Sequence, residues 1–96
     1  MTPIEMWQKI KAEYPDTIIM IRVGDFQEVY GDDATKCGAI LGLTIATMHS
    51  KGQSLPMAGF PHHYIDSKLS KLIQAGQRVA LVEWKSDNVP QNAGIA

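Results

Sequence analysis

The chain has 96 residues, a formal net charge of −1, and a composition of 45% hydrophobic and 20% charged residues. This size and composition support one small globular core and exclude the disordered and membrane-spanning classes. Because nonspecific binding to nucleic-acid backbones scales with the number of phosphates that Lys and Arg neutralise, the near-neutral charge also excludes an indiscriminate phosphate binder. Any nucleic-acid contact would have to use a local patch.

The sequence shows neither a targeting segment nor a disulfide framework. No apolar run approaches the roughly 18 residues of a membrane span, and the opening Met1-Thr2-Pro3 is unlike a signal peptide. The single cysteine, Cys37, can form neither an internal disulfide nor a zinc knuckle. We therefore expect an intracellular protein of the cytoplasm or nucleoid, without metal or other cofactor, whose stability comes from packing.

The first expected element is an amphipathic helix. Thr2 has the properties of an N-cap, Pro3 suits the first helical position, and Glu5 completes a capping box. Apolar residues then recur at helical spacing until Pro15 ends the helix. Trp7 lies on this apolar face, which favours a role as a core anchor over a role in binding.

A buried strand follows over residues 17–23, which are rich in β-branched residues and mostly apolar on both alternating faces. Residues 24–25 then form a tight turn into a second strand that begins at Phe26. Alternation places Phe26, Glu28 and Tyr30 on one sheet face, and Gln27 and Val29 on the other. One face would therefore carry an aromatic ring and a carboxylate side by side.

A second helix is expected after this hairpin. Asp32 or Asp33 would cap its free N–H groups at the positive end of the helix dipole. Gly42 would end it, because glycine adopts the left-handed conformation without a Cβ clash. Its buried stripe comprises Ala34, Cys37, Ile40 and Leu41. A thiol on such a stripe is usually inert, so we do not expect Cys37 to act as a nucleophile.

The middle of the chain predicts strands with less regular patterns. Residues 43–48 are expected to form a strand, and residues 49–54 a polar loop. Residues 55–61 suit a short extended segment. Prolines lie near both ends of this segment, so we expect it at a sheet edge or interrupted.

A third helix is expected after residues 62–64, ending at Gly76. Its apolar face comprises Ile65, Leu69, Leu72 and Ile73. A last strand would cover residues 78–84. The resulting order αββαββαβ predicts an α+β fold, with a small mixed β-sheet and flanking helices. We expect one domain over residues 1–85, with residues 86–96 forming a flexible tail or linker.

The polar residues do not form a recognisable catalytic or metal site. Four carboxylates fall between residues 25 and 33, but their spacing departs from an EF-hand loop, and turn formation or helix capping accounts for three of them. His62 and His63 are adjacent, so their rings diverge in an extended chain. The sequence also lacks a phosphate-binding Gly-x-x-x-x-Gly-Lys-Ser/Thr loop. We therefore expect a non-catalytic domain.

Phe26 is the most informative residue, and it allows two interpretations. It could belong to the core, or its exposed ring could slide between base steps, which costs least where bases are mismatched or unpaired. Glu28 would repel phosphates, yet on the same face it could hydrogen-bond a base edge. The candidate cations for contacts to a nucleic-acid backbone are Arg22, Lys51, Lys68 and Lys71.

Residues 24–34, Gly-Asp-Phe-Gln-Glu-Val-Tyr-Gly-Asp-Asp-Ala, resemble the Phe-x-Glu segment of the N-terminal mismatch-recognition domain (domain I) of the MutS DNA mismatch-repair family. Further similar segments are Thr2-Pro3, Leu43-Thr44, residues 56–63 and residues 79–83. The resemblance covers roughly residues 2–84. It implies a MutS domain I-like fold that meets DNA as part of a larger clamp. It also implies that Phe26 stacks against a mispaired or unpaired base from the minor-groove side, with Glu28 contacting a base edge.

The partners implied by this resemblance are double-stranded DNA with a mismatch or small loop, and other repair or replication proteins, with no membrane. ATP binding would belong only to family domains outside these 96 residues. An alternative is a protein-interaction or accessory module that keeps the domain I fold without mismatch binding. The near-neutral charge favours this alternative, as do Ile45 and Ala46, where the family commonly has basic residues.

Overall fold

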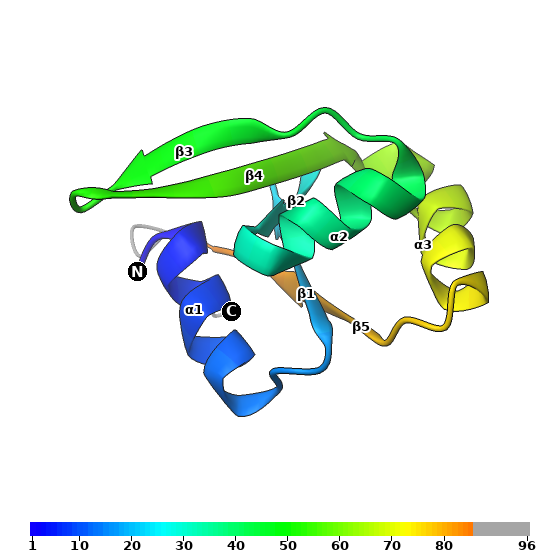
Figure 1. The fold of residues 1–96 in the computed structure, drawn as a ribbon, viewed down its shortest axis with the longest axis horizontal. Helices are drawn as coiled ribbons and strands as arrows, with labels where there is room; N and C mark the ends of the chain where they lie inside the picture. Colours follow the sequence, from blue (N-terminus) through cyan, green and yellow to red (C-terminus); the bar gives the residue numbers. More distant parts are fainter. Residues whose placement is uncertain (86–96) are drawn as a thin grey trace, which may run out of the picture.

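The computed structural model describes residues 1–85, so the tail predicted from Ser86 lies outside the described residues. The elements follow the order αββαββαβ, which confirms the predicted fold class: a five-stranded mixed sheet with flanking helices (Figure 1). They are α1 (Pro3–Glu13), β1 (Ile18–Val23), β2 (Phe26–Tyr30), α2 (Gly31–Leu41), β3 (Ala46–Ser50), β4 (Gln53–Pro61), the 3₁₀ turn η1 (His62–Tyr64), α3 (Ile65–Gln74) and β5 (Val79–Glu83). Within residues 1–85, no helix is long and apolar enough to cross a membrane.

The strands lie in the order β3-β4-β2-β1-β5, and only the β1–β5 pair is parallel. The predicted β1–β2 hairpin is confirmed, with Val23 paired to Phe26 across a two-residue turn. Gly24 in this turn has a φ of 59°, a left-handed conformation that favours glycine. Because β2 lies in the middle of the sheet, its backbone is held by neighbours on both sides.

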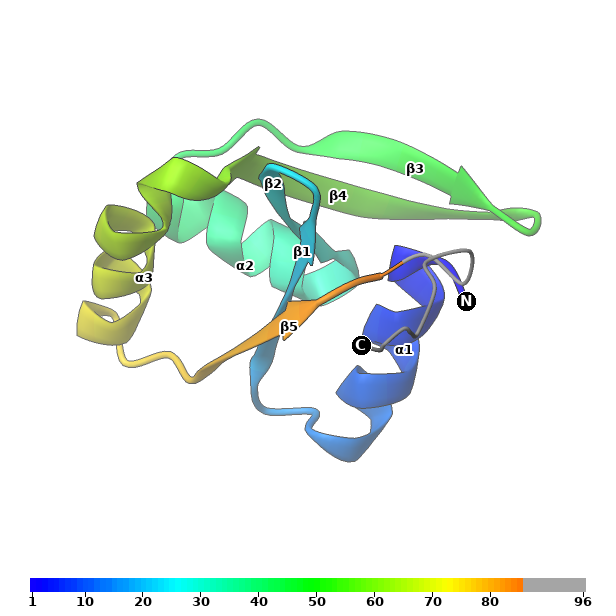
Figure 2. The same ribbon diagram turned by 180° about the vertical axis from the view of Figure 1, so that it is seen from behind.

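Two hydrophobic clusters cover the two faces of the sheet. Alternate β1 residues divide between them, since Ile18 and Met20 pack with α2 and α3 whereas Ile19 and Ile21 pack with α1. The strand is therefore buried on both faces, as its sequence predicts. Seen from behind, β1, β2 and β5 stand in front of α2 (Figure 2). Trp7 of α1 packs against the second cluster, in line with the anchoring role expected of it.

The capping box at the start of α1 is confirmed: Thr2 accepts from the Glu5 backbone N–H, and the Glu5 side chain accepts from the Thr2 N–H. The prediction that Asp32 or Asp33 caps α2 is wrong, because that helix begins at Gly31 after Tyr30 and has no side-chain cap. Asp33 is instead 1% exposed and lies beneath α1. Gly42 ends α2 in the left-handed conformation, as expected.

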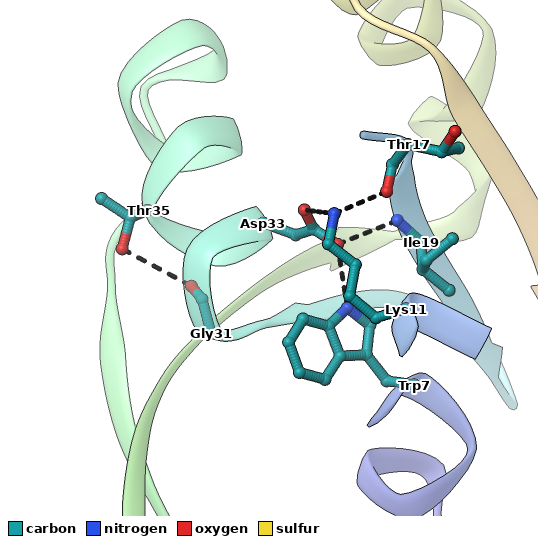
Figure 3. Close-up of polar contacts among 7 residues, drawn as sticks. All are labelled: Trp7, Lys11, Thr17, Ile19, Gly31, Asp33 and Thr35. Atoms are coloured by element: carbon teal, nitrogen blue, oxygen red, sulfur yellow. Dashed lines mark hydrogen bonds and ion pairs between the residues drawn. The ribbon is translucent and has the colours of Figure 1, made fainter. Parts of the chain in front are cut away.

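The Asp33 carboxylate joins three elements (Figure 3). Its Oδ2 accepts from Trp7 Nε1 and from the backbone N–H of Ile19, each at 2.9 Å. Its Oδ1 lies 2.8 Å from Lys11 Nζ, which also donates to the carbonyl of Thr17. The buried charge is thus paired and hydrogen-bonded on both oxygens, the condition under which burial of a carboxylate is tolerated.

The middle of the chain differs from its prediction. β3 begins three residues later than expected, and the predicted polar loop is a β3–β4 hairpin with a turn at Lys51 and Gly52. The ribbon projects beyond the rest of the sheet (Figure 1), so polar residues along it stay solvated and hide the strand pattern. β4 is not an edge strand: it pairs with β3 and with β2. Pro56 lies one residue beyond the part that pairs with β2, which explains how the strand tolerates it.

The third helix also differs in its apolar face. Leu72 is buried and Ile65 packs against the same cluster, but Ile73 is 59% exposed and its predicted burial is wrong. Ile65, Leu69 and Leu72 follow the i, i+4, i+7 spacing that faces the sheet, and Ile73 falls at the edge of that stripe.

The last strand is shorter than predicted, since Arg78 lies outside β5, although the Arg78 carbonyl accepts from the Ile18 N–H.

Replacement of Asp33 by Asn should destabilise the fold by about 2–4 kcal/mol, because it leaves the largely buried Lys11 ammonium without its counter-charge. Asp32→Asn is the matched control, since Asp32 is the preceding residue and is exposed. The control should cost less than about 1 kcal/mol, the usual contribution of a helix dipole. Urea unfolding of both variants measures the difference, and equal losses would contradict a structural role for Asp33.

Candidate nucleic-acid interface

Phe26 opens β2 directly after the hairpin turn. Its side chain is 49% exposed and belongs to neither core cluster, so the structure does not support the core interpretation. The backbone beneath the ring is held on both sides, by Val23 in β1 and by Pro61 in β4. The His62 N–H also donates to the Asp25 carbonyl at 2.6 Å and ties the turn to the end of β4. An exposed ring thus stands on a fixed part of the backbone.

Glu28 lies two residues further along β2 and is partly buried. The hydroxyl of the fully buried Tyr30 donates a hydrogen bond to Glu28 Oε1, which confirms that these two residues share a sheet face. Burial and the bond to Glu28 raise the pKa of Tyr30 above its usual value. The phenol therefore stays protonated and remains a donor to the carboxylate.

Two neighbours shape this face. The ring of Tyr30 meets Trp7 edge to face, with the centroids 6.2 Å apart. Gly59 of β4 is paired with Glu28, and a Cβ there would lie 2.7 Å from the carbonyl oxygen of Gln27. Glycine therefore allows β4 to approach β2 closely at the position of the carboxylate.

The opposite face of β2 carries a polar network. The buried Gln27 amide lies 2.7 Å from His62 Nδ1, and Arg22 Nη1 lies 3.0 Å from His62 Nε2. A guanidinium can only donate, so Nε2 accepts and the imidazole proton sits on Nδ1. The Gln27 oxygen must then accept that proton, since amide orientation is assigned from hydrogen-bonding partners. In this orientation the NH₂ group of Gln27 occupies the other end of the amide. That end is buried and has no hydrogen-bond partner within residues 1–85.

A surface pocket of about 230 Å³ adjoins this network, and Arg22, Gln27, His62, Leu81, Val82 and Glu83 line it. Arg22 Nε also donates to the Gly24 carbonyl at 3.0 Å. The guanidinium therefore holds the hairpin turn and His62 at the same time. Its hydrogen bonds run within the protein, on the face of the sheet opposite Phe26.

The other candidate cations do not gather around Phe26. Lys51 lies at the β3–β4 turn and forms an ion pair with Glu5, which is also hydrogen-bonded to Thr2. These contacts lower the pKa of Glu5 to about 2. Lys68 and Lys71 belong to α3, which packs on the sheet face opposite Phe26 and Glu28. Ile45 and Ala46 are exposed before and at the start of β3.

The remaining chemistry-bearing side chains show no catalytic arrangement. Among residues 1–85, no three His, Cys, Asp or Glu side chains converge to hold a metal ion. Cys37 is buried, which raises the pKa of its thiol to about 12 and keeps it protonated. His63 stacks on Tyr64 with the ring centroids 4.0 Å apart.

Sequence reasoning placed Phe26 and Glu28 on one face but missed what holds each in place. The spacing of Glu28 and Tyr30 carried the signal for their contact, because residues two apart on a strand share a face. The network of Arg22, Gln27 and His62 had no such signal. Its members lie on three separate elements that only the folded chain brings together.

Residues 2–95 match the family model described as MutS domain I. The chain belongs to this family. It is 41% identical over 88 residues to the DNA mismatch repair protein MutS of Christiangramia forsetii and 47% identical over 88 residues to that of Parabacteroides distasonis. The Bacteroides thetaiotaomicron protein of the same name is 46% identical over 79 residues.

These alignments cover 91%, 90% and 81% of the chain, respectively. They cover only 9–10% of the relatives, so the chain spans about a tenth of their length. The similarity therefore concerns one domain of much longer proteins. In this MutS domain I, the half-exposed ring of Phe26 and the carboxylate of Glu28 stand on the same face of β2.

His62→Ala should destabilise this MutS domain I by about 1–3 kcal/mol, because it removes the only side-chain partner that Gln27 has within residues 1–85. His63→Ala is the matched control, since His63 is adjacent and exposed and should change stability by less than about 0.5 kcal/mol. Chemical unfolding of both variants tests the network. A His62 variant as stable as the control would show that the network contributes nothing.

Proposed function

We propose that this MutS domain I is a non-catalytic DNA-binding module that recognises mismatched or unpaired bases. Phe26 inserts beside the distorted base, and Glu28 contacts a base edge next to it. The observation that carries the proposal is the half-exposed ring of Phe26, which stands outside both core clusters and beside a carboxylate. Insertion costs least where bases are already poorly stacked, so it selects deformable sites without reading their sequence.

The fixed backbone supports this role. Phe26 is paired with residues on both neighbouring strands, and the adjacent turn is tied down by hydrogen bonds to Arg22 and His62. A ring on such a support loses little conformational freedom on binding, so more of its stacking energy remains as affinity. A mobile loop would lose that advantage.

Because of the charges around the ring of Phe26, the preference for mismatched over matched DNA is more informative than the overall affinity for DNA. Glu28 repels phosphates, Arg22 is hydrogen-bonded within the protein on the opposite face of the sheet, and the three candidate lysines lie on other elements. Phosphate contacts supply most of the affinity of DNA-binding proteins, so the 96-residue chain should bind weakly. In a longer protein of this family, other domains would supply those contacts, and this domain would supply discrimination.

Phe26→Ala should reduce the preference for mismatched over matched duplex by about 5-fold or more, the lower end of the measured value of one base–aromatic stack. Tyr14→Ala is the matched control, because Tyr14 is an aromatic residue that is 57% exposed at the C-terminal end of α1, outside the hairpin that carries Phe26. This variant should leave the preference unchanged. Fluorescence anisotropy at low salt with two duplexes that differ by one base pair gives the ratio. A ratio that survives the loss of Phe26 would contradict the proposal.

A protein-interaction module is the second candidate function. The exposed Ile45, 44% accessible before β3, favours it because that apolar surface suits a protein partner better than a phosphate backbone. It predicts no mismatch preference at any salt concentration, together with recovery of a repair or replication protein in a pull-down. Loss of that recovery in Ile45→Asp, with DNA preference absent in the parent chain, would decide for this candidate.

A further inference from the structure

Tyr30 places a hydroxyl group inside a hydrophobic cluster that apolar packing already stabilises. Its side chain is fully buried in the cluster formed with α1, and its ring is already fixed by packing against Trp7. The hydroxyl makes one side-chain hydrogen bond within residues 1–85, to Glu28 Oε1. A phenylalanine would fill the same space, so the hydroxyl is accounted for by what it does to Glu28.

We propose that Tyr30 is a positioning residue that holds the Glu28 carboxyl group so that only Oε2 is available to a base. This inference rests on the proposed function and deepens it. The backbone of Glu28 is paired on both sides, to Ile21 and to Gly59, so the remaining freedom lies in its side-chain torsions. A hydrogen bond from a buried donor removes that freedom before DNA arrives.

The bond also assigns different tasks to the two carboxyl oxygens. The Tyr30 hydroxyl donates its proton to Glu28 Oε1, so Oε1 must act as the acceptor. Oε1 therefore carries no proton, whether or not the carboxyl group is ionised. When ionised, Glu28 would accept from a base donor through Oε2. When protonated, it would donate from Oε2 to a base acceptor. In both states the same oxygen faces the base, which fixes the geometry of recognition.

Tyr30→Phe tests the inference because it removes one oxygen atom and keeps the ring. In the free protein, three-bond NMR couplings should show Glu28 moving from one rotamer to an average of several. In DNA binding, the mismatch preference should fall by roughly 3- to 10-fold, the worth of one hydrogen bond. The hydroxyl proton of Tyr30 in the unaltered chain should exchange slowly enough to be observed, a measurement that requires no variant.

A double-mutant cycle separates positioning from simple stabilisation. If Tyr30 acts through Glu28, Tyr30→Phe should lower the mismatch preference in the unaltered chain and leave the preference of the Glu28→Ala variant unchanged. A merely structural role would weaken binding to matched and mismatched duplexes equally in both backgrounds.

The outcomes also distinguish this inference from the proposed function. If the unaltered chain shows no mismatch preference, the proposed function fails, and Glu28 rotamers in Tyr30→Phe still report whether Tyr30 positions the carboxyl group. Unchanged Glu28 rotamers, or averaged rotamers with a full mismatch preference, would overturn the inference. A rapidly exchanging Tyr30 hydroxyl in the unaltered chain would overturn it as well.

Discussion

The buried carboxylate of Asp33 is the interaction on which the rest of the structure depends. It accepts from the indole of Trp7 and the backbone of Ile19, and it pairs with Lys11, so one side chain joins α1, β1 and α2. Because a buried charge is costly unless each of these partners is in place, the three elements must adopt one arrangement. That arrangement sets Trp7 against Tyr30, and Tyr30 in turn holds Glu28.

The two faces of β2 serve different purposes within this frame. One face presents the ring of Phe26 and the carboxyl group of Glu28. On the other face, Gln27 bonds to His62, and His62 bonds in turn to Arg22. This polar network also stiffens the end of the hairpin, since Arg22 Nε donates to the Gly24 carbonyl. These hydrogen bonds therefore support the hairpin that carries the ring of Phe26. They also engage Arg22, which the sequence suggested as a contact to the phosphate backbone.

Local patterns predicted the elements whose causes are local. The capping box of Thr2 and Glu5, the glycine that ends α2 and the β1–β2 turn each depend on residues within a few positions of one another. Predictions failed where distant partners decided the outcome. Asp33 has the position of a helix cap, but Trp7 and Lys11 draw its carboxylate into the core. β4 has prolines that suggest an edge strand, yet it pairs with β3 on one side and with β2 on the other.

The sequence by itself determined the fold class and placed Phe26 and Glu28 on one face, because strand alternation and turn chemistry are properties of neighbouring residues. Its motifs also pointed to the family that the comparison confirmed. Only the tertiary structure decided that Phe26 is exposed, that Tyr30 is buried against Trp7 of α1, and that Arg22 bonds to His62. These outcomes depend on which side chains meet across separate elements, and distance along the chain carries no information about such meetings.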